Sequence, residues 1–517
     1  MVFVLEMVFV GFVTVSVLFL LVLALYNLHL VRIYRRFRGP DPTPKITYAE
    51  DDLPKVSVQL PVFNEGYLAE QCLRLSAALD YPHNKLQIQF IDDSTDGETS
   101  DLAAKTIDAL KLEYPDISFQ LLRRENREGF KAGGLRYATE RATGEFVAIF
   151  DADFLIPPSF LRDTIDHFNQ PEIGAVQARW NYVNCDEQLF TRLQANKLDL
   201  HQMFEQAARA RSQRPVMFHG TAGVWRVETL EAAGGWNCET EVEDTEISIR
   251  AALKGWEVVY LDHLRIPSEL PETVKGFVVQ QMRWRRGGAR VTRIYTRDIL
   301  KAGVDLRTKF DLMVRVHITW GPIGALVMTL AVLPFFMMAE KHNFVLPAAV
   351  LYLSGLVIAL ITRYFETATL DQDPTPRPEL SMHPFLYAMP LNYLLFSMGT
   401  LWPLVQATVE GLFGAPRQWQ VTPKSNSVGD DPNRGTVPRR QPLPGYAIGT
   451  LTLGALGGIL VLASILTGHF LAVIFYGMLA LGCGYIGLNL LVAHGYSLGM
   501  FDKFMIKASK KVEQPAT

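Results

Sequence analysis

Two aspartates, Asp151 and Asp153, directly follow an apolar run and form the clearest candidate for chemistry in this chain. Alternate carboxylates at a strand end can hold a divalent cation between protein and diphosphate, because Mg²⁺ and Mn²⁺ prefer oxygen ligands. Asp-x-Asp is also common in surface turns, so the pair alone decides little. The preceding apolar run, Phe146–Phe150, is what favours a metal-binding strand end.

A second pair, Asp92 and Asp93, also ends an apolar run and offers acceptors for a ribose or a base edge. Lys131 offers a cation near phosphate. The segment from Asp92 to Gly97 is equally typical of a solvated turn with a helix cap, because Ser, Thr and Asp favour both. On these residues alone, both interpretations stay open.

Further along, Glu243 and Asp244 open an amphipathic segment that ends at Gly255. Acidic residues are favoured at a helix N-terminus by the helix dipole, which is the structural explanation. The functional explanation makes one of the carboxylates a general base whose pKa is tuned by its neighbours and by partial burial.

The stretch Gln280-Gln281-Met282-Arg283-Trp284 lies within a basic amphipathic segment. An interfacial helix whose arginines face lipid headgroups would explain this composition. Alternatively, Arg283 lies beside a departing diphosphate and Trp284 stacks on a sugar ring. Both can hold, because one helix has two faces. The other basic residues of the segment are Lys275, Arg285, Arg286, Arg290, Arg293 and Arg297.

These residues need a scaffold that brings strand ends together. The predicted strands are Val56–Leu60, Gln87–Ile91, Ser118–Leu122 and Phe146–Phe150, separated by segments of helical apolar spacing at Leu68–Leu79, Thr99–Tyr114 and Ala132–Ala142. Alternating strands and helices predict an α/β domain with a parallel sheet wound in the Rossmann manner. Ligands bind such sheets beyond the carboxyl ends of the strands, where both aspartate motifs fall. A nucleotide-type ligand is therefore the leading hypothesis.

Composition excludes several other classes of protein. The 517 residues carry 50 basic and 53 acidic side chains, a net charge of −3, which argues against a nucleic-acid partner. Apolar residues make up 49% of the chain, so it is not globally disordered. The four cysteines are widely separated and argue against a disulfide scaffold or a structural zinc site. They are Cys72, Cys185, Cys238 and Cys483.

The first apolar run, Val8 to Leu30, is long enough to cross a bilayer as a helix. A cleaved signal peptide would need a cationic start and a shorter core, yet Glu6 precedes this run and four arginines follow it. We therefore predict a retained anchor, with the basic cluster and the domain from about Tyr48 to Arg315 in the cytoplasm. The arginines are Arg32, Arg35, Arg36 and Arg38.

Five apolar stretches follow Arg315: Val316–Ala339, Phe344–Thr362, Met382–Val409, Tyr446–Thr467 and Leu471–Ala493. If all five crossed, the basic residues before Tyr446 and after Ala493 would lie outside the cell, against the positive-inside rule. Placing the proline-broken stretch Met382–Val409 along the cytoplasmic interface removes both conflicts. We expect five spanning helices, one before the soluble domain and four after it, with the C-terminus in the cytoplasm.

Together these motifs resemble the processive membrane glycosyltransferases of family 2, which include cellulose, hyaluronan and chitin synthases. The resemblance covers Val56 to about Arg290 and is carried by four motifs in order: Asp92-Asp93, Asp151-x-Asp153, Glu243-Asp244 and Gln280-x-x-Arg283-Trp284. Within that family, three stretches resemble plant cellulose-synthase-like enzymes that make mannan and xyloglucan backbones. These are His219–Arg226, Asp92–Asp96 and Phe150–Phe154.

The resemblance implies a role for each matched residue. Asp244 is expected to be the catalytic base. The nucleotide-sugar site would include Asp92, Asp93, Lys131, Asp151, Gln280, Arg283 and Trp284. A metal ion, Mg²⁺ or Mn²⁺, would be held by Asp151 and Asp153. The acceptor would meet His219, Gly220, Thr221, Glu243 and Trp284. A cytoplasmic gating loop that inserts over the bound nucleotide sugar is expected at Trp419, Val421, Thr422 and Lys424.

The fold implied is a cytoplasmic GT-A (Rossmann-like) domain inserted in an α-helical transmembrane bundle. Its segments would be an N-terminal anchor (1–40), the GT-A domain (48–270), interfacial helices (271–310), a transmembrane hairpin (311–366), an interfacial helix with the gating loop (380–440), a second hairpin (444–495) and a cytoplasmic tail (496–517). A cyclic-dinucleotide sensor domain is not expected after the last span.

The function implied is an inverting, metal-dependent synthase of the plasma or inner membrane that polymerises a β-glycan and secretes it. UDP-glucose is the expected donor, with a growing polysaccharide and the lipid bilayer as partners. GDP-mannose with a β-mannan product is one alternative, and single addition of glucose to a ceramide-type lipid is another. A non-enzymatic scaffold is disfavoured, because carboxylates stand at all the matched positions.

Overall fold

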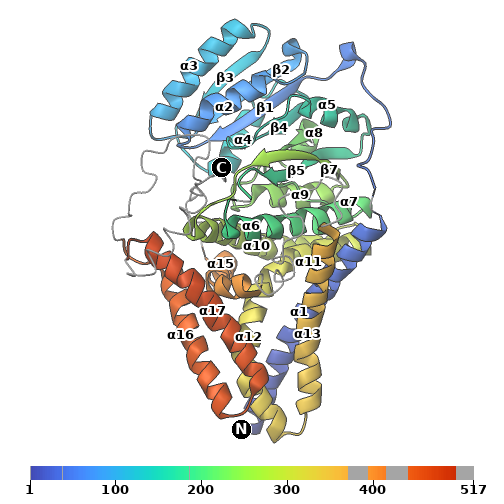
Figure 1. Ribbon diagram of the computed structural model, residues 1–517. Helices are drawn as coiled ribbons and strands as arrows, with labels where there is room; N and C mark the ends of the chain where they lie inside the picture. The colour runs from blue at the N-terminus through green and yellow to red at the C-terminus, as the bar shows by residue number, and fades with distance from the viewer. Residues whose placement is uncertain (1, 38, 186, 371–393, 415–440, 497–517) are drawn as a thin grey trace, which may run out of the picture.

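The computed structural model describes residues 2–37, 39–185, 187–370, 394–414 and 441–496. An α/β domain stands above a bundle of long helices, and further helices lie across the level between them (Figure 1). The α/β class expected from alternating strands and helices is therefore observed.

A seven-stranded sheet forms the core of the upper domain, in the order β3-β2-β1-β4-β6-β5-β7. The strands are β1 (Val56–Val62), β2 (Leu86–Asp92), β3 (Ser118–Arg123), β4 (Phe146–Ile149), β5 (Ile173–Tyr182), β6 (Gly223–Arg226) and β7 (Glu257–Ser268). The first four pair in parallel as predicted. Only β6, among the described strands, runs antiparallel to its neighbours β4 and β5, which the sequence pattern did not reveal.

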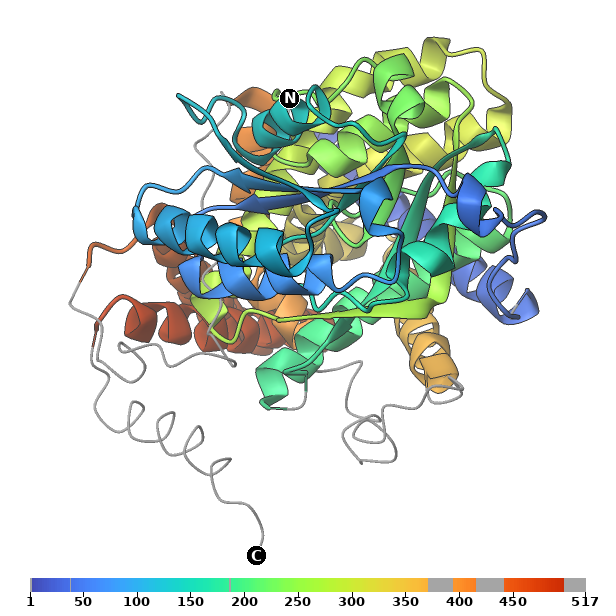
Figure 2. The ribbon, with the colours of Figure 1, turned by 90° about the horizontal axis from the view of Figure 1, so that it is seen from above.

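Helices cover both faces of this sheet, which explains why β2 is buried along its whole length. One face packs against α2 (Gly66–Ala77), α3 (Glu98–Glu113) and α5 (Phe160–Ile165). The opposite face packs against α4 (Phe130–Thr139), α8 (Val227–Ala232) and α9 (Glu243–Leu253). Seen from above, α2 and α3 run side by side along the sheet (Figure 2).

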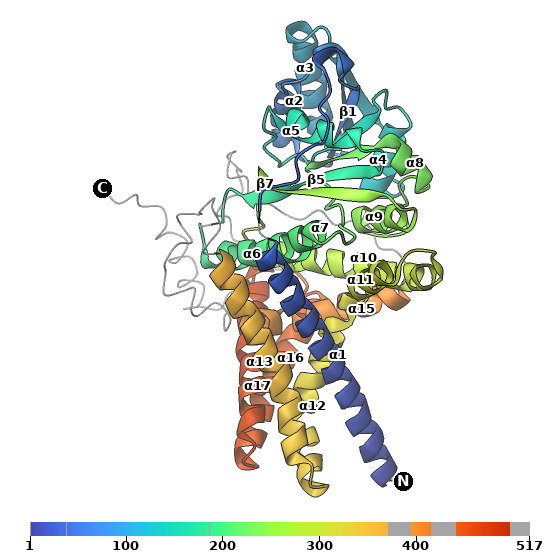
Figure 3. The ribbon, with the colours of Figure 1, turned by 90° about the vertical axis from the view of Figure 1, so that its right-hand side faces the viewer.

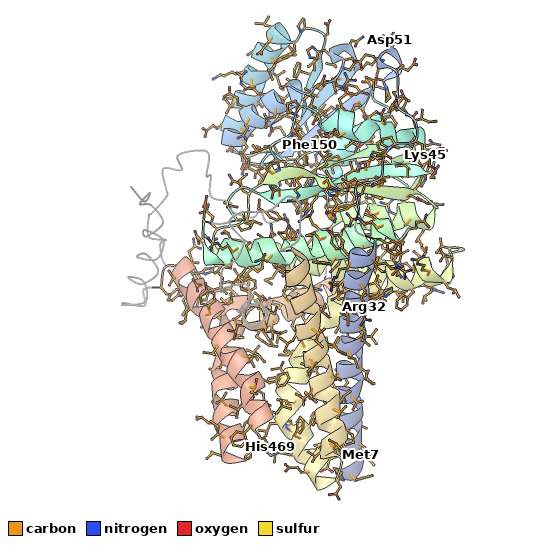
Figure 4. All side chains as sticks on the ribbon, turned by 45° about the vertical axis from the view of Figure 1, so that its right-hand side comes forward. Met7, Arg32, Lys45, Asp51, Phe150 and His469 are labelled. Atoms are coloured by element: carbon orange, nitrogen blue, oxygen red, sulfur yellow. The ribbon has the colours of Figure 1, made fainter. Side chains whose placement is uncertain are left out.

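The lower bundle contains α1 (Val2–Arg36), α12 (Gly321–Lys341), α13 (Val345–Leu370), α16 (Gly445–Leu466) and α17 (Phe470–Ala493). Four described segments are long and apolar enough to cross a membrane: Phe3–Arg36, Leu306–Lys341, Gly445–Leu466 and Phe470–Ala493. The helix α13 packs beside α1 in the same bundle (Figure 3). Met7 and His469 lie at the end of the bundle far from the domain, and Arg32 lies at the near end (Figure 4). The five-span arrangement and its orientation stay predictions.

Several helices lie across the junction between domain and bundle (Figure 3). They are α6 (Leu189–Asp199), α10 (Val274–Lys301), α11 (Leu306–His317) and α15 (Leu401–Phe413). With 13 residues, α15 is about 20 Å long, shorter than the roughly 30 Å hydrocarbon core. It packs against α10, α12 and α16. An interfacial position for the predicted stretch Met382–Val409, of which residues 394–409 are described, remains a prediction.

Within the bundle, α12 contains Pro334, which lacks an N–H and so leaves the carbonyl of Leu330 without its usual helical donor. Tyr476 of α17 supplies the replacement: its hydroxyl donates to the Leu330 oxygen at 3.0 Å. The same hydroxyl accepts from the Leu333 amide at 3.2 Å. A backbone group without a partner is costly in hydrocarbon, so this tyrosine stabilises the proline-containing turn.

Candidate active site

An upper cavity of about 190 Å³ opens beyond the carboxyl ends of β1, β2 and β4. This is the edge where parallel α/β sheets bind ligands, as expected. Most of the residues singled out from the sequence lie around it. Those that line it are Asp93, Lys131, Asp151, Asp153, His219, Gly220, Glu243, Asp244, Gln280, Arg283 and Trp284.

At the end of β4, Asp151 forms an ion pair with Lys131 of α4, with 2.5 Å between Oδ1 and Nζ. The ammonium also donates to the Gly220 carbonyl at 2.9 Å, and the hydroxyl of buried Thr221 accepts from the Asp151 amide at 2.8 Å. Burial alone would lower the pKa of Lys131, but the carboxylates of Asp151 and Glu243 outweigh burial and raise it. Lys131 is therefore a fixed cation among the acidic groups of the cavity.

The carboxylates of Asp151 and Asp153 face the same cavity, as a metal site at this strand end requires. Among the described residues, no group of three or more His, Cys, Asp or Glu side chains gathers as a self-sufficient metal site. Mg²⁺ and Mn²⁺ sites at phosphates commonly use only one or two carboxylates, with the substrate and water supplying the other oxygens. The pair Asp151 and Asp153 fits that kind of site.

Asp92 and Asp93 follow each other at the end of β2 but have different surroundings. Asp92 is buried, accepts from the Ser94 amide and the Ser100 hydroxyl, and is absent from the described lining of the upper cavity. Asp93 lines the cavity and is held by the guanidinium of Arg124. The structure thus places Asp93, rather than Asp92, in the wall of the upper cavity, and the predicted nucleoside contacts of both stay predictions.

A stacked pair beside Asp93 was missed by the sequence reasoning. The guanidinium of Arg127 lies 3.4 Å from the ring centroid of Phe63, and both side chains line the upper cavity. A flat cation–π pair of this kind offers a surface on which a nucleobase can stack. The only sequence signal was the position of Phe63 in the loop after the first strand.

The turn that opens α9 brings Glu243 and Asp244 to the cavity wall. Gly220 lies opposite with φ +81°, and a Cβ on it would stand 3.1 Å from the Asp244 Oδ2 atom, so glycine allows this close approach. Burial raises the pKa of Glu243 to about 7, against the opposing effect of Lys131. Burial also raises the pKa of Asp244, while the Thr245 amide opposes the shift. A carboxylate with a raised pKa suits a general base near neutral pH.

The raised pKa of Asp244 predicts the pH dependence of turnover. A base acts only when deprotonated, so activity should rise with pH through the raised pKa of Asp244 and fall as the pH drops below it. The measurement is kcat/KM from about pH 5 to pH 8, which reports ionisations of the free enzyme. A kcat/KM that stays level across this pH range, as expected for a base with the usual aspartate pKa of 3.8, would contradict this assignment.

The helix α10 presents its two faces to two different cavities. Gln280 and Arg283, three residues apart, line the upper cavity. Gln281 and Arg285 line a lower cavity, and Trp284 lies between and borders both. Burial lowers the pKa of Arg283, opposed by nearby carboxylates with Glu243 foremost. The guanidinium thus remains a cation facing the acidic wall of the upper cavity.

The lower cavity holds about 390 Å³ and reaches from Asp244 down to Asn27 of α1 and Arg315 of α11. A π-helix, Leu200–Ala207, forms part of its wall. On that helix, His201 Nδ1 lies 2.9 Å from Glu205 Oε2, and Arg315 Nη1 lies 3.4 Å from the same oxygen. Charged and hydrogen-bonding groups beside aromatic rings can bind the hydroxyls and the ring faces of sugars.

His219 and Trp180 border both cavities. Burial lowers the pKa of His219 well below its usual value, so the ring is neutral at pH 7, and its Nε2 contacts the Gln206 amide. Sequence reasoning singled out His219 but missed Trp180, His201 and Glu205, which stand singly in unremarkable stretches. The predicted gating-loop residues lie outside the described residues: Trp419, Val421, Thr422 and Lys424.

A cavity at the sheet edge, lined by paired aspartates and a buried lysine, is typical of nucleotide-sugar transferases with a GT-A domain. Residues 54–287 match the family "Glycosyltransferase like family 2". Glucomannan 4-beta-mannosyltransferase 2 from Arabidopsis thaliana is 33% identical over 77% of this chain and 73% of its own length. Glucomannan 4-beta-mannosyltransferase 1 from Oryza sativa subsp. japonica is 34% identical over 76% of this chain and 73% of its own length.

Glucomannan 4-beta-mannosyltransferase 7 from Arabidopsis thaliana is 36% identical over 56% of this chain, which spans about half (52%) of that relative's length. Among solved structures, the mannosyltransferase PcManGT from Pyrobaculum calidifontis, in complex with GDP-Man and Mn²⁺, aligns with a TM-score of 0.51. It is 20% identical and covers 78% of this chain and 99% of its own. The chain belongs to the family 2 glycosyltransferases, in the cellulose-synthase-like group of membrane enzymes, and the predicted GT-A fold is confirmed.

Proposed function

We propose that this chain is a processive inverting glycosyltransferase that extends a β-linked mannan or glucomannan from GDP-mannose and passes the product through the membrane. The observation that carries the proposal is the pair of cavities that share Asp244 and Trp284. One cavity suits a nucleotide sugar, and the other suits the acceptor chain. A base and a stacking ring at their boundary are where a new glycosidic bond would form.

The relatives favour GDP-mannose over UDP-glucose as the donor. Their names describe mannosyl transfer, and PcManGT binds GDP-Man. The alternative donor named from the sequence is therefore better supported than UDP-glucose. Arg127 over Phe63 offers a flat surface on which a purine or a pyrimidine base could stack.

Inversion needs no covalent enzyme intermediate, because the nucleotide sugar already has an activated anomeric carbon. The acceptor hydroxyl attacks that carbon from the face opposite the diphosphate, the bond from carbon to diphosphate oxygen breaks, and Asp244 takes the hydroxyl proton. Arg283 faces the charge that develops on the leaving diphosphate. Asp151 and Asp153 would hold Mg²⁺ or Mn²⁺, which supplies further neutralisation of that charge when bound.

Trp284 would stack on the acceptor's terminal sugar. The lower cavity would hold the sugars behind it, with His201, Glu205 and Arg315 bonding to hydroxyls. An acceptor that stays seated after each addition gives a processive enzyme. The position of this cavity against α1 and α11 supports export along the membrane helices. A catalytic domain in the cytoplasm follows from the basic residues after the first apolar run.

The test is transfer of radiolabelled sugar by the purified full-length protein in nanodiscs. GDP-mannose and UDP-glucose are compared with Mg²⁺, Mn²⁺ and a chelator, and products are sized before and after β-mannanase. We expect a long, mannanase-sensitive product from GDP-mannose that requires the metal. Long product from UDP-glucose alone would overturn the donor assignment. A short product that extracts into organic solvent would instead indicate a glycolipid transferase.

A further inference from the structure

The guanidinium of Arg286 joins two carboxylates that belong to different parts of the molecule. Its Nε donates to Glu410 of α15 at 2.9 Å, and its Nη1 donates to Glu241 at 3.1 Å. The three side chains are largely buried, with 10% of Arg286, 10% of Glu241 and 16% of Glu410 exposed. Charges held this far from water interact more strongly than surface pairs do, so removal of one leaves another poorly compensated.

Glu241 begins the turn that carries the proposed base. It lines the upper cavity together with Val242, Glu243 and Asp244. Burial raises the pKa of Glu241, and Arg286 is the foremost opposing influence. Arg286 therefore stabilises the ionised form of Glu241 and holds the turn in position.

The turn Glu241–Asp244, α10 and α15 also approach one another closely at two glycines. A Cβ on Gly287 of α10 would lie 2.8 Å from the Val242 side chain, so α10 contacts the turn Glu241–Asp244 directly. A Cβ on Gly411 of α15 would collide with the carbonyl oxygen of Arg286, so α15 crosses α10 on another side. Glycines at both crossings allow these close approaches.

The C-terminal end of α15 is attached to α10 by two further arginines. Arg293 donates to the Leu412 carbonyl at 3.1 Å, and Arg290 donates to the Gly414 carbonyl at 2.8 Å. Cationic side chains at a helix C-terminus satisfy its last carbonyls and favour its dipole. Since α15 also packs on the bundle helices α12 and α16, it connects the bundle with α10.

We propose that Arg286 is a positioning residue that holds the catalytic turn Glu241–Asp244 in a fixed position relative to α15. The membrane part of the chain would then determine where the carboxylate of Asp244 lies. The proposal rests on the transferase function proposed above. Arg286 and Glu410 are absent from the described lining of both cavities. An effect of Glu410 on turnover would therefore be indirect, and we propose that it passes through Arg286 and the turn.

The test compares Glu410→Gln, Glu241→Gln and Arg286→Gln with the exposed controls Glu239→Gln and Arg297→Gln. Misplacement of a reacting group by about 1 Å can cost roughly 100-fold in rate. We expect kcat to fall about 10-fold in Glu410→Gln and about 100-fold in Arg286→Gln, with donor KM within about twofold of wild type. Arg286→Lys should recover part of the lost rate, because it keeps the positive charge. The recovery should be incomplete, because one ammonium cannot reproduce the guanidinium fork.

Two further measurements separate positioning from a purely structural effect. Glu410→Gln combined with Arg286→Gln should be no slower than Arg286→Gln alone, because both act through one connection. Hydrogen exchange of peptides covering residues 238–246 should quicken in Glu410→Gln, although the substitution lies on another helix. Unchanged exchange there, or a loss of thermal stability with unchanged kcat, would overturn the proposal. If wild-type protein transfers no sugar, the proposed function fails, while the exchange result still decides the positioning role.

Discussion

Asp244→Asn should reduce sugar transfer by about 10²- to 10⁴-fold, the usual contribution of a general base. Asparagine has nearly the shape of aspartate but cannot take the acceptor proton. Gly220 leaves room at this position, and the Thr245 amide can still donate to the remaining oxygen. We therefore expect the fold and nucleotide-sugar binding to survive. Initial rates of radiolabel transfer and calorimetric binding of GDP-mannose measure the two properties separately.

Glu243→Gln is the matched comparison for that variant, since it neutralises the adjacent carboxylate of the same turn. It should retain more activity than Asp244→Asn, because the proposed base is still present. If Asp244→Asn kept a substantial fraction of wild-type turnover while Glu243→Gln lost it, the two roles would have to be exchanged.

Arg283→Ala should lower kcat by about 10²- to 10³-fold, as removal of one preorganised donor to a developing charge does elsewhere. The guanidinium lies in the wall of the upper cavity, facing Glu243 and Asp151. Its stabilising effect is greatest when the diphosphate gains charge on departure, so kcat should fall more than donor KM rises. Steady-state kinetics with varied donor concentration give both constants.

Two variants complete the experiment on Arg283. Arg283→Lys keeps the charge but loses the planar fork, so its rate should lie between those of wild type and Arg283→Ala. Arg297→Ala changes an exposed arginine further along the same helix and should be near wild type. A rise in donor KM with unchanged kcat in Arg283→Ala would make the residue a ground-state contact instead.

The fold was predictable where the sequence pattern is periodic and the elements are local. The four parallel strands up to Phe150 and the helices between them follow from apolar spacing. The antiparallel β6 is only four residues long and pairs with partners distant in sequence, so no local pattern identifies it. The long β7 bulges against β5, which also obscures any simple alternation.

The site was predictable where a motif holds several chemically distinctive residues close together in sequence. Asp151, Asp153, Asp244 and Arg283 were all singled out this way, and all line the upper cavity. Residues of the lower cavity were missed, since single residues such as His201 become informative only when tertiary packing brings them together. Their specific roles are still predictions that the experiments above examine.

The hydroxyl of Tyr476 has a consequence for where a polysaccharide could leave. Separating α12 from α17 would break its two hydrogen bonds and expose the Leu330 carbonyl to hydrocarbon, where each such bond is worth about 0.6–2 kcal/mol. These hydrogen bonds oppose separation of the two helices. If the product is exported through the bundle, a passage that widens for each sugar should run beside this helix pair, and the contact between α12 and α17 should stay closed.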